Sequence, residues 1–105
     1  VYKNQFAIAV CPGDIESPTV LAAQTANELL DISGINASFV LTVYQEKIYM
    51  SARSIDEVNV QIIAEKLGGG GHINSAGAQF DHTNMEEAIS TLKETIDDMI
   101  EKGDI

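Results

Sequence analysis

Residues 37–51 read ASFVLTVYQEKIYMS, and this stretch decides the fold class. Its two ends, Ala37–Tyr44 and Ile48–Ser51, are rich in the β-branched and aromatic side chains that are typical of strands. The polar residues Gln45, Glu46 and Lys47 lie between them and predict a hairpin turn. Because a hairpin joins antiparallel strands, a sheet built around this stretch cannot be wholly parallel.

The segment before the hairpin predicts a strand followed by a helix. Gln5–Val10 (QFAIAV) is a short apolar run typical of a strand that is buried on both faces. Cys11-Pro12-Gly13-Asp14 ends this strand. A helix is then expected from Pro18 to about Ile32, with the preceding serine as its N-cap and a serine-glycine pair at its end.

The segment after the hairpin predicts two more helices and another strand. Ser54-x-x-Glu57 has the pattern of a capping box that opens a second helix, and the glycines at 68–71 end it. Ala76–Phe80 (AGAQF) predicts a strand. Thr83-x-x-Glu86 is a second capping box, and the helix behind it carries apolar residues at a spacing of about 3.6.

This order of elements predicts an α/β domain. We expect a mixed β-sheet of four to five strands with about three flanking helices. The 105 residues are enough for one domain over 1–105. Because the chain begins with Val1 and not with methionine, we expect it to be a fragment of a longer multidomain protein.

The composition is that of a globular protein, with 45% hydrophobic residues and a mean hydropathy of +0.02. No apolar run approaches the roughly 18 residues that a membrane-spanning helix needs, and no signal peptide is visible. The single cysteine, Cys11, cannot form an internal disulfide, which favours a reducing compartment. We interpret Cys11 as structural, because no basic neighbour in the sequence would activate its thiol.

The net charge of −10 restricts the classes of ligand. Long nucleic acids and anionic membranes are both bound through basic patches, and this chain has none. The acidic excess is concentrated after residue 80, whereas acids and bases balance between 47 and 77. The only arginine, Arg53, lies in this balanced stretch, so we expect an anionic ligand to bind there.

The segment Gly68-Gly69-Gly70-Gly71-His72 is the strongest candidate for a binding site. One glycine commonly ends a helix, but four in succession cost folding entropy that a cap does not explain. Consecutive glycines can direct several backbone N–H groups at one anion, and His72 adds a side-chain donor. The alternative is that these glycines are structural and serve the domain itself. The segment lacks the features of a P-loop or a dinucleotide-binding fingerprint.

Arg53 is the second candidate, because its guanidinium offers a fork of donors suited to phosphate or a plane that stacks on a base. The alternative is an ordinary surface ion pair. His72, His82 and Cys11 do not have the spacing of metal ligands, and Asp81-His82-Thr83 is interpreted as a turn. We therefore predict a binding site with no catalytic and no metal-binding residues in this chain.

The residues from 69 to 77, GGGHINSAG, resemble the Gly-Gly-Gly-His-x-x-Ala-Ala-Gly signature of the DHH-associated domain, with Ser75 in place of the first alanine. That domain is the smaller C-terminal lobe of the DHH-family phosphoesterases. The residues SARS at 51–54 and VNVQ at 58–61 look most like the GdpP type. This type comprises bacterial membrane-anchored phosphodiesterases that hydrolyse cyclic di-AMP.

The resemblance implies a substrate-binding role for particular residues. Gly69, Gly70, Gly71 and His72 match the loop that contacts the nucleotide, and Arg53 matches a family arginine placed for phosphate or base. We add Ser54 and Asn74 as candidate substrate-binding neighbours. In the family a manganese pair is held by aspartates and histidines of the larger DHH domain, so no cofactor is expected in this chain.

The resemblance also implies a function for the whole protein. We expect the substrate-binding lobe of a phosphodiesterase that converts cyclic di-AMP to pApA. The alternatives are an oligoribonuclease or pAp phosphatase of the same superfamily, and a non-catalytic RNA-binding appendage like that of alanyl-tRNA synthetases. The expected partners are a cyclic dinucleotide or short oligonucleotide, the DHH domain of the same chain and a second copy of the protein. The domain itself is expected in the cytoplasm without membrane contact, in a parent anchored to the plasma membrane.

Overall fold

The structure is a computed structural model that describes residues 5–11, 18–32, 34–56, 58–81 and 83–103. It contains five strands and three helices within these ranges. In chain order they are β1 (Phe6–Val10), α1 (Pro18–Leu29), β2 (Ala37–Tyr44), β3 (Lys47–Ser54), α2 (Val60–Lys66), β4 (Gly70–His72), β5 (Ser75–Phe80) and α3 (Met85–Lys102).

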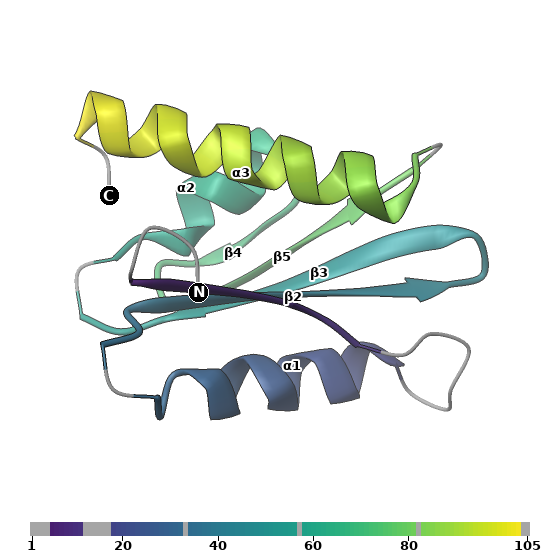
Figure 1. Cartoon of the computed structure of the whole chain (residues 1–105), viewed down its shortest axis with the longest axis horizontal. Coiled ribbons are helices and arrows are strands. Elements are labelled where there is room, and N and C mark those ends of the chain that lie inside the picture. Colours follow the sequence, from purple (N-terminus) through teal and green to yellow (C-terminus); the bar gives the residue numbers. More distant parts are fainter. Residues whose placement is uncertain (1–4, 12–17, 33, 57, 82, 104–105) are drawn as a thin grey trace.

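All five strands form one mixed sheet in the order β1-β2-β3-β5-β4. β1 is parallel to β2, and the other three neighbouring pairs are antiparallel. Figure 1 shows α1 on one side of this sheet and α2 and α3 on the other. The expected α/β class, with a mixed sheet and three flanking helices, is therefore confirmed.

The hairpin that decides the fold has a turn of two residues. Tyr44 pairs with Lys47, so Lys47 is the first residue of β3 and not part of the turn. Gln45 and Glu46 make the turn with φ values of 50° and 66°. Positive φ at both central residues gives a turn whose twist matches the twist of the two strands. The predicted turn was one residue too long.

Most of the buried apolar residues lie between the sheet and the helices α2 and α3. Alternate residues of β2 and β3 point into this large core, since successive side chains of a strand face opposite ways. Met50 and Ala52 of β3 belong to it, together with Ile63 of α2 and Leu92 of α3. On β2, Phe39 and Leu41 point into the large core, and the alternate residues Ser38 and Val40 face α1 instead.

The layer under α1 is thinner and is built from small residues. Ala22 and Ala26 of α1 pack on Val40 and Cys11. The hydroxyl of Ser38 is fully buried and donates to the carbonyl oxygen of Ala26 at 2.6 Å. Small side chains let α1 lie close to the strands, and this hydrogen bond satisfies the buried hydroxyl. Cys11 is buried, in agreement with a structural role.

Both predicted capping boxes are wrong in detail. α2 begins at Val60, and its N-cap is Asn59, whose side chain accepts from the N–H of Ile62. Ser54 is instead the last residue of β3, because the ladder with β2 continues to this point. At α3 the N-cap is Asn84, one residue later than predicted.

α1 ends at Leu29, earlier than the predicted Ile32, because the following backbone N–H groups bond three residues back in turns. The predicted N-cap at Ser17 and most of the break after Cys11 lie outside the described residues. Within the described residues, none of the three helices has both the length and the apolar character needed to cross a membrane.

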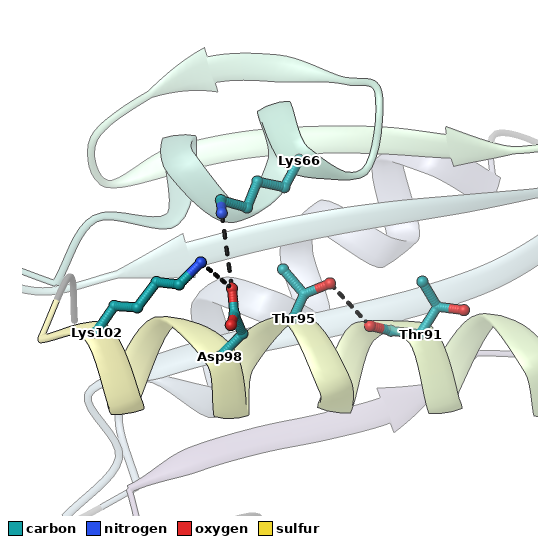
Figure 2. A network of polar contacts seen from close by, with 5 residues as sticks. All are labelled: Lys66, Thr91, Thr95, Asp98 and Lys102. Atoms are coloured by element: carbon teal, nitrogen blue, oxygen red, sulfur yellow. Dashed lines mark hydrogen bonds and ion pairs between the residues drawn. The ribbon is translucent and has the colours of Figure 1, made fainter.

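An ion-pair cluster joins α2 to α3 (Figure 2). The carboxylate of Asp98 lies 3.1 Å from Nζ of Lys102 and 3.7 Å from Nζ of Lys66. The hydrogen bond from Lys102 is the main cause that lowers the pKa of Asp98 below its ordinary value. Lys66 is the last residue of α2, so the cluster connects the end of this helix, next to the glycines, with α3.

Candidate functional site

The glycine segment is an edge strand and not an open loop. Gly70, Gly71 and His72 form β4, which pairs antiparallel with β5. Gly68 ends α2 with a φ of 89°, a left-handed conformation that favours glycine. The N–H of Gly69 donates to the carbonyl oxygen of Ala64 at 2.8 Å. Much of the backbone in this segment therefore already takes part in the end of α2 or in the pairing of β4 with β5.

The structure supplies structural reasons for three of the four glycines: close packing for two and backbone conformation for one. A Cβ on Gly69 would collide with the carbonyl oxygen of Gly77, and a Cβ on Gly71 would lie 2.5 Å from Cα of Ala76. Gly68 has the positive φ described above. Gly70 differs, because a Cβ there would meet nothing within 4 Å and its φ is not in the left-handed range. The alternative that the glycines are structural therefore explains Gly68, Gly69 and Gly71 but not Gly70.

Arg53 and His72 lie in one row across the sheet. Arg53 of β3 pairs with Ser75 of β5, and Ser75 pairs on its other side with His72 of β4. Adjacent strands are about 4.8 Å apart, so the backbones of Arg53 and His72 are separated by roughly 10 Å. The chain between them forms α2 and then returns to the sheet as β4. This return brings together two candidates that are distant in sequence.

The three side chains of this row point to the side of the sheet on which α1 lies. Directly opposed residues of antiparallel strands share a face, and their neighbours Ala52 and Ala76 belong to the large core on the other face. Within the described residues, the small core under α1 takes no member from β4 or β5. Ser75 and His72 are exposed, and Arg53 is half-buried.

We call this surface the open face and define it by Arg53, Ser75, His72, Gly77 and Gly70. Gly77 pairs with Gly70, and these two are the next residues on the same face beside the row of three. No side chains rise from these two positions. A ligand could therefore approach the backbone of β5 and β4 closely beside the row of Arg53, Ser75 and His72.

The guanidinium of Arg53 is available for a ligand. Its Nη1 donates to the carbonyl oxygen of Ala52 at 2.8 Å. Among the residues that the structure describes, Arg53 forms no ion pair, so the surface ion-pair alternative finds no support here. The remaining donors of the guanidinium fork can bind an anionic oxygen.

Ser54 and Asn74 hold the frame of the site and do not lie on the open face. Nδ2 of Asn74 donates to Oγ of Ser54 at 2.9 Å, and the carbonyl oxygens of Asp56 and Val58 are also within its reach. Ser54 is buried, and its hydroxyl donates to Val58 at 2.6 Å. These bonds connect the end of β3 with the turn between β4 and β5. They fix the relative positions of Arg53 and His72.

A separate surface cavity of about 630 Å³ lies at the opposite end of β3. Its lining includes the hairpin turn at Gln45 and Glu46 and the start of α3 at Asn84. Polar groups of this lining already bond to one another: the side chain of Asn84 accepts from the N–H of Glu87 at 2.8 Å, and the hydroxyl of Thr83 donates to the carboxylate of Glu87 at 2.8 Å. None of the predicted binding residues lines this cavity. We therefore place the candidate site on the open face.

Ser75 is the residue that sequence reasoning left without a role. Its place between the histidine and the second alanine of the signature was visible, but its position between Arg53 and His72 depends on strand register. Within the described ranges no group of three or more His, Cys, Asp or Glu residues could hold a metal ion. His82 lies outside the described residues.

Comparison with curated proteins shows the similarity of this chain to known phosphodiesterases. The cyclic-di-AMP phosphodiesterase PdeA of Listeria monocytogenes is 44% identical over 98 residues, which are 92% of this chain and 15% of that protein. The cyclic-di-AMP phosphodiesterase GdpP of Bacillus subtilis is 43% identical over 106 residues, covering 98% of this chain and 16% of that protein. The chain thus spans only about a sixth of each relative.

A relative with lower sequence identity is named for a different activity. The bifunctional oligoribonuclease and PAP phosphatase NrnA of Thermus thermophilus is 35% identical over 65 residues, which are 62% of this chain and 20% of that protein.

Two solved structures share the fold. An exopolyphosphatase-related protein of Bacteroides fragilis superposes with a TM-score of 0.79 at 24% identity, covering 94% of this chain and 31% of that one. The C-Ala domain of Aquifex aeolicus alanyl-tRNA synthetase gives a TM-score of 0.67 at 20% identity, with coverage of 86% and 88%. The family described as the DHHA1 domain matches residues 3–101. The chain therefore belongs to the DHHA1 domain family.

Proposed function

We propose that this domain is the substrate-binding lobe of a phosphodiesterase that hydrolyses cyclic di-AMP to pApA. The observation that carries the proposal is the row in which Arg53 and His72 flank Ser75 on the open face. The identity of 43–44% to two cyclic-di-AMP phosphodiesterases over most of the chain supports the choice of ligand.

The chemistry of the row suits a nucleotide phosphate. The guanidinium of Arg53 offers paired donors for phosphate oxygens, and the imidazole of His72 offers a further donor. The bare backbone at Gly70 leaves room for the ligand beside them. The contribution of this lobe is to hold and orient the substrate at a distance from the reacting bond.

The hydrolytic chemistry belongs to the larger DHH domain that the family likeness implies. A manganese pair held by that domain would supply the metal-ion chemistry of phosphodiester hydrolysis, while the residues of this lobe would bind and orient the substrate. That domain would face the open face of this lobe. We also propose a parent protein anchored in the plasma membrane with this lobe on the cytoplasmic side, and self-association of the parent.

An oligoribonuclease or pAp phosphatase is the second candidate, and the similarity to NrnA favours it. Its ligand would also carry phosphate, so the row would serve it in the same way. An RNA-binding appendage like C-Ala shares the fold, but the net charge of −10 opposes binding of a long RNA.

Titration of the protein with four ligands separates these functions. Cyclic di-AMP, its linear product pApA, pAp and a short RNA are added in turn, with metal chelated so that no ligand is consumed. Calorimetry should rank cyclic di-AMP or pApA first. Stronger binding of the RNA would contradict the proposed function and favour the appendage. Comparable binding of pAp and short RNA, with none of cyclic di-AMP, would favour the second candidate.

A further inference from the structure

We propose that Ser75 is a third side-chain contact for the anionic ligand and that its hydroxyl donates to a phosphate oxygen. This proposal rests on the proposed function and deepens it. The DHH-associated signature has alanine at this position, so the contact would be an addition that this chain makes to the general site.

The position of Ser75 is set by strand register on both sides. It pairs with Arg53 of β3 and with His72 of β4, and all three side chains share the open face. Ser75 is exposed. Within the described residues, no hydrogen bond of the Ser75 hydroxyl to another protein group is found, so this hydroxyl can donate to a ligand.

The reach of the two flanking side chains places the ligand above Ser75. Arg53 and His72 rise from strands roughly 10 Å apart, with β5 midway between them. A single phosphate that accepts hydrogen bonds from both side chains would lie between the two outer strands, over β5. The side chain at position 75 is therefore the nearest one below that phosphate.

The size and chemistry of serine suit this position. A long side chain would occupy the space in which the phosphate must lie, whereas serine leaves it open. Its hydroxyl is a donor that can rotate toward an oxygen above it. Hydrogen bonds to charged groups are stronger than those between neutral groups, so loss of this one should be measurable.

The test compares Ser75→Ala and Ser75→Thr with the unchanged protein. Thr keeps the hydroxyl and suits a strand, and Ser90→Ala on the exposed part of α3 is the matched control. Binding of cyclic di-AMP and of pApA is measured by calorimetry and by NMR titration with metal chelated. Thermal unfolding is recorded for each variant to separate a change in folding from a change in binding.

We expect Ser75→Ala to bind about tenfold more weakly, at an unchanged unfolding temperature. Ser75→Thr should retain most of the affinity, and Ser90→Ala all of it. If Ser75→Ala binds as tightly as the unchanged protein while Arg53→Ala and His72→Ala bind more weakly, the role of Ser75 is wrong and the proposed function stands. If the unchanged protein binds neither nucleotide, both proposals fail together.

Discussion

Arg53 and His72 lie on opposite sides of a single strand, although all of α2 separates them in the chain. Each pairs with Ser75, and both side chains point to the side of the sheet away from the large core. The two candidates therefore lie in one row of the sheet without any rearrangement of the fold.

Removal of either flanking side chain should weaken ligand binding. We expect Arg53→Ala and His72→Ala each to cost about 1.5–3 kcal/mol of binding free energy for cyclic di-AMP, the range for hydrogen bonds to charged groups. Lys47→Ala, at the other end of β3, is the matched control for loss of a cation. Calorimetry with metal chelated measures all three. Equal affinity of Arg53→Ala and the unchanged protein would show that Arg53 does not contact the ligand and is an ordinary surface residue.

The glycines should separate into two groups. Gly69→Ala and Gly71→Ala place a methyl group against the backbone of β5, and we expect each to lose about 1–3 kcal/mol of folding stability. Gly70→Ala meets open space and should fold at least as stably, yet its methyl group projects onto the open face and should weaken nucleotide binding. Urea denaturation and calorimetry measure the two effects. A stable Gly70→Ala variant with full affinity would show that the ligand does not lie beside β4.

Asn74 should matter for stability, because its amide bridges the end of β3 and the β4–β5 turn. Asn74→Ala leaves the acceptors at Ser54 and Asp56 without this donor, and we expect a loss of about 1–3 kcal/mol of folding stability. Asn59→Ala, which removes the N-cap of α2, should cost about 1 kcal/mol. Urea denaturation of both variants is the measurement. An unchanged midpoint for Asn74→Ala would show that the bridge contributes nothing.

The ion-pair cluster at Asp98 should add a small pH dependence to stability. Lys102, by its hydrogen bond, and Lys66 lower the pKa of Asp98 below 3.8 in the folded protein. A carboxylate with a depressed folded pKa contributes stability above its unfolded pKa, and this contribution disappears as the pH falls through the folded pKa. Asp98→Asn should therefore flatten the pH dependence of the unfolding free energy below about pH 4.

The group is exposed, so the change should be slight and should shrink with added salt. Glu101→Gln on the same helix is the control, for which the structure shows no ion pair within the described residues. If the unfolding free energies of Asp98→Asn and of the unchanged protein have the same pH dependence at low salt, the ion pairs of Asp98 do not contribute to stability.

The hairpin turn offers a route to a more stable protein. Gln45 and Glu46 both have positive φ, which costs a residue with a side chain about 1–2 kcal/mol. Replacement of the pair by Asn-Gly, the sequence preferred in such turns, should raise the unfolding free energy by about 1 kcal/mol. Thermal and urea denaturation measure the gain. Gln24→Asn on the exposed side of α1 is a control for the amide change alone, and a loss of stability in the turn variant would contradict the turn geometry.

Local sequence patterns were sufficient for the fold class and for every element except β4, which lies in the glycine segment. Ala37–Tyr44 and Ile48–Ser51 are strand-forming, and the apolar stripe of α3 defines one buried face. These signals are local, because propensity and periodicity act within a few residues. The ends of the elements were less accurate: Asn59, not Ser54, caps α2, because the β2–β3 ladder holds Ser54 in β3.

The candidate site was only partly visible in the sequence. The glycine-histidine signature identified the segment and the family, and Arg53 was distinguished by its charge. The sequence by itself could not assign Gly69 and Gly71 to close packing on β5, or place Ser75 between Arg53 and His72. Only the tertiary structure decided these points, because strand order and register join residues across α2 that no local pattern connects.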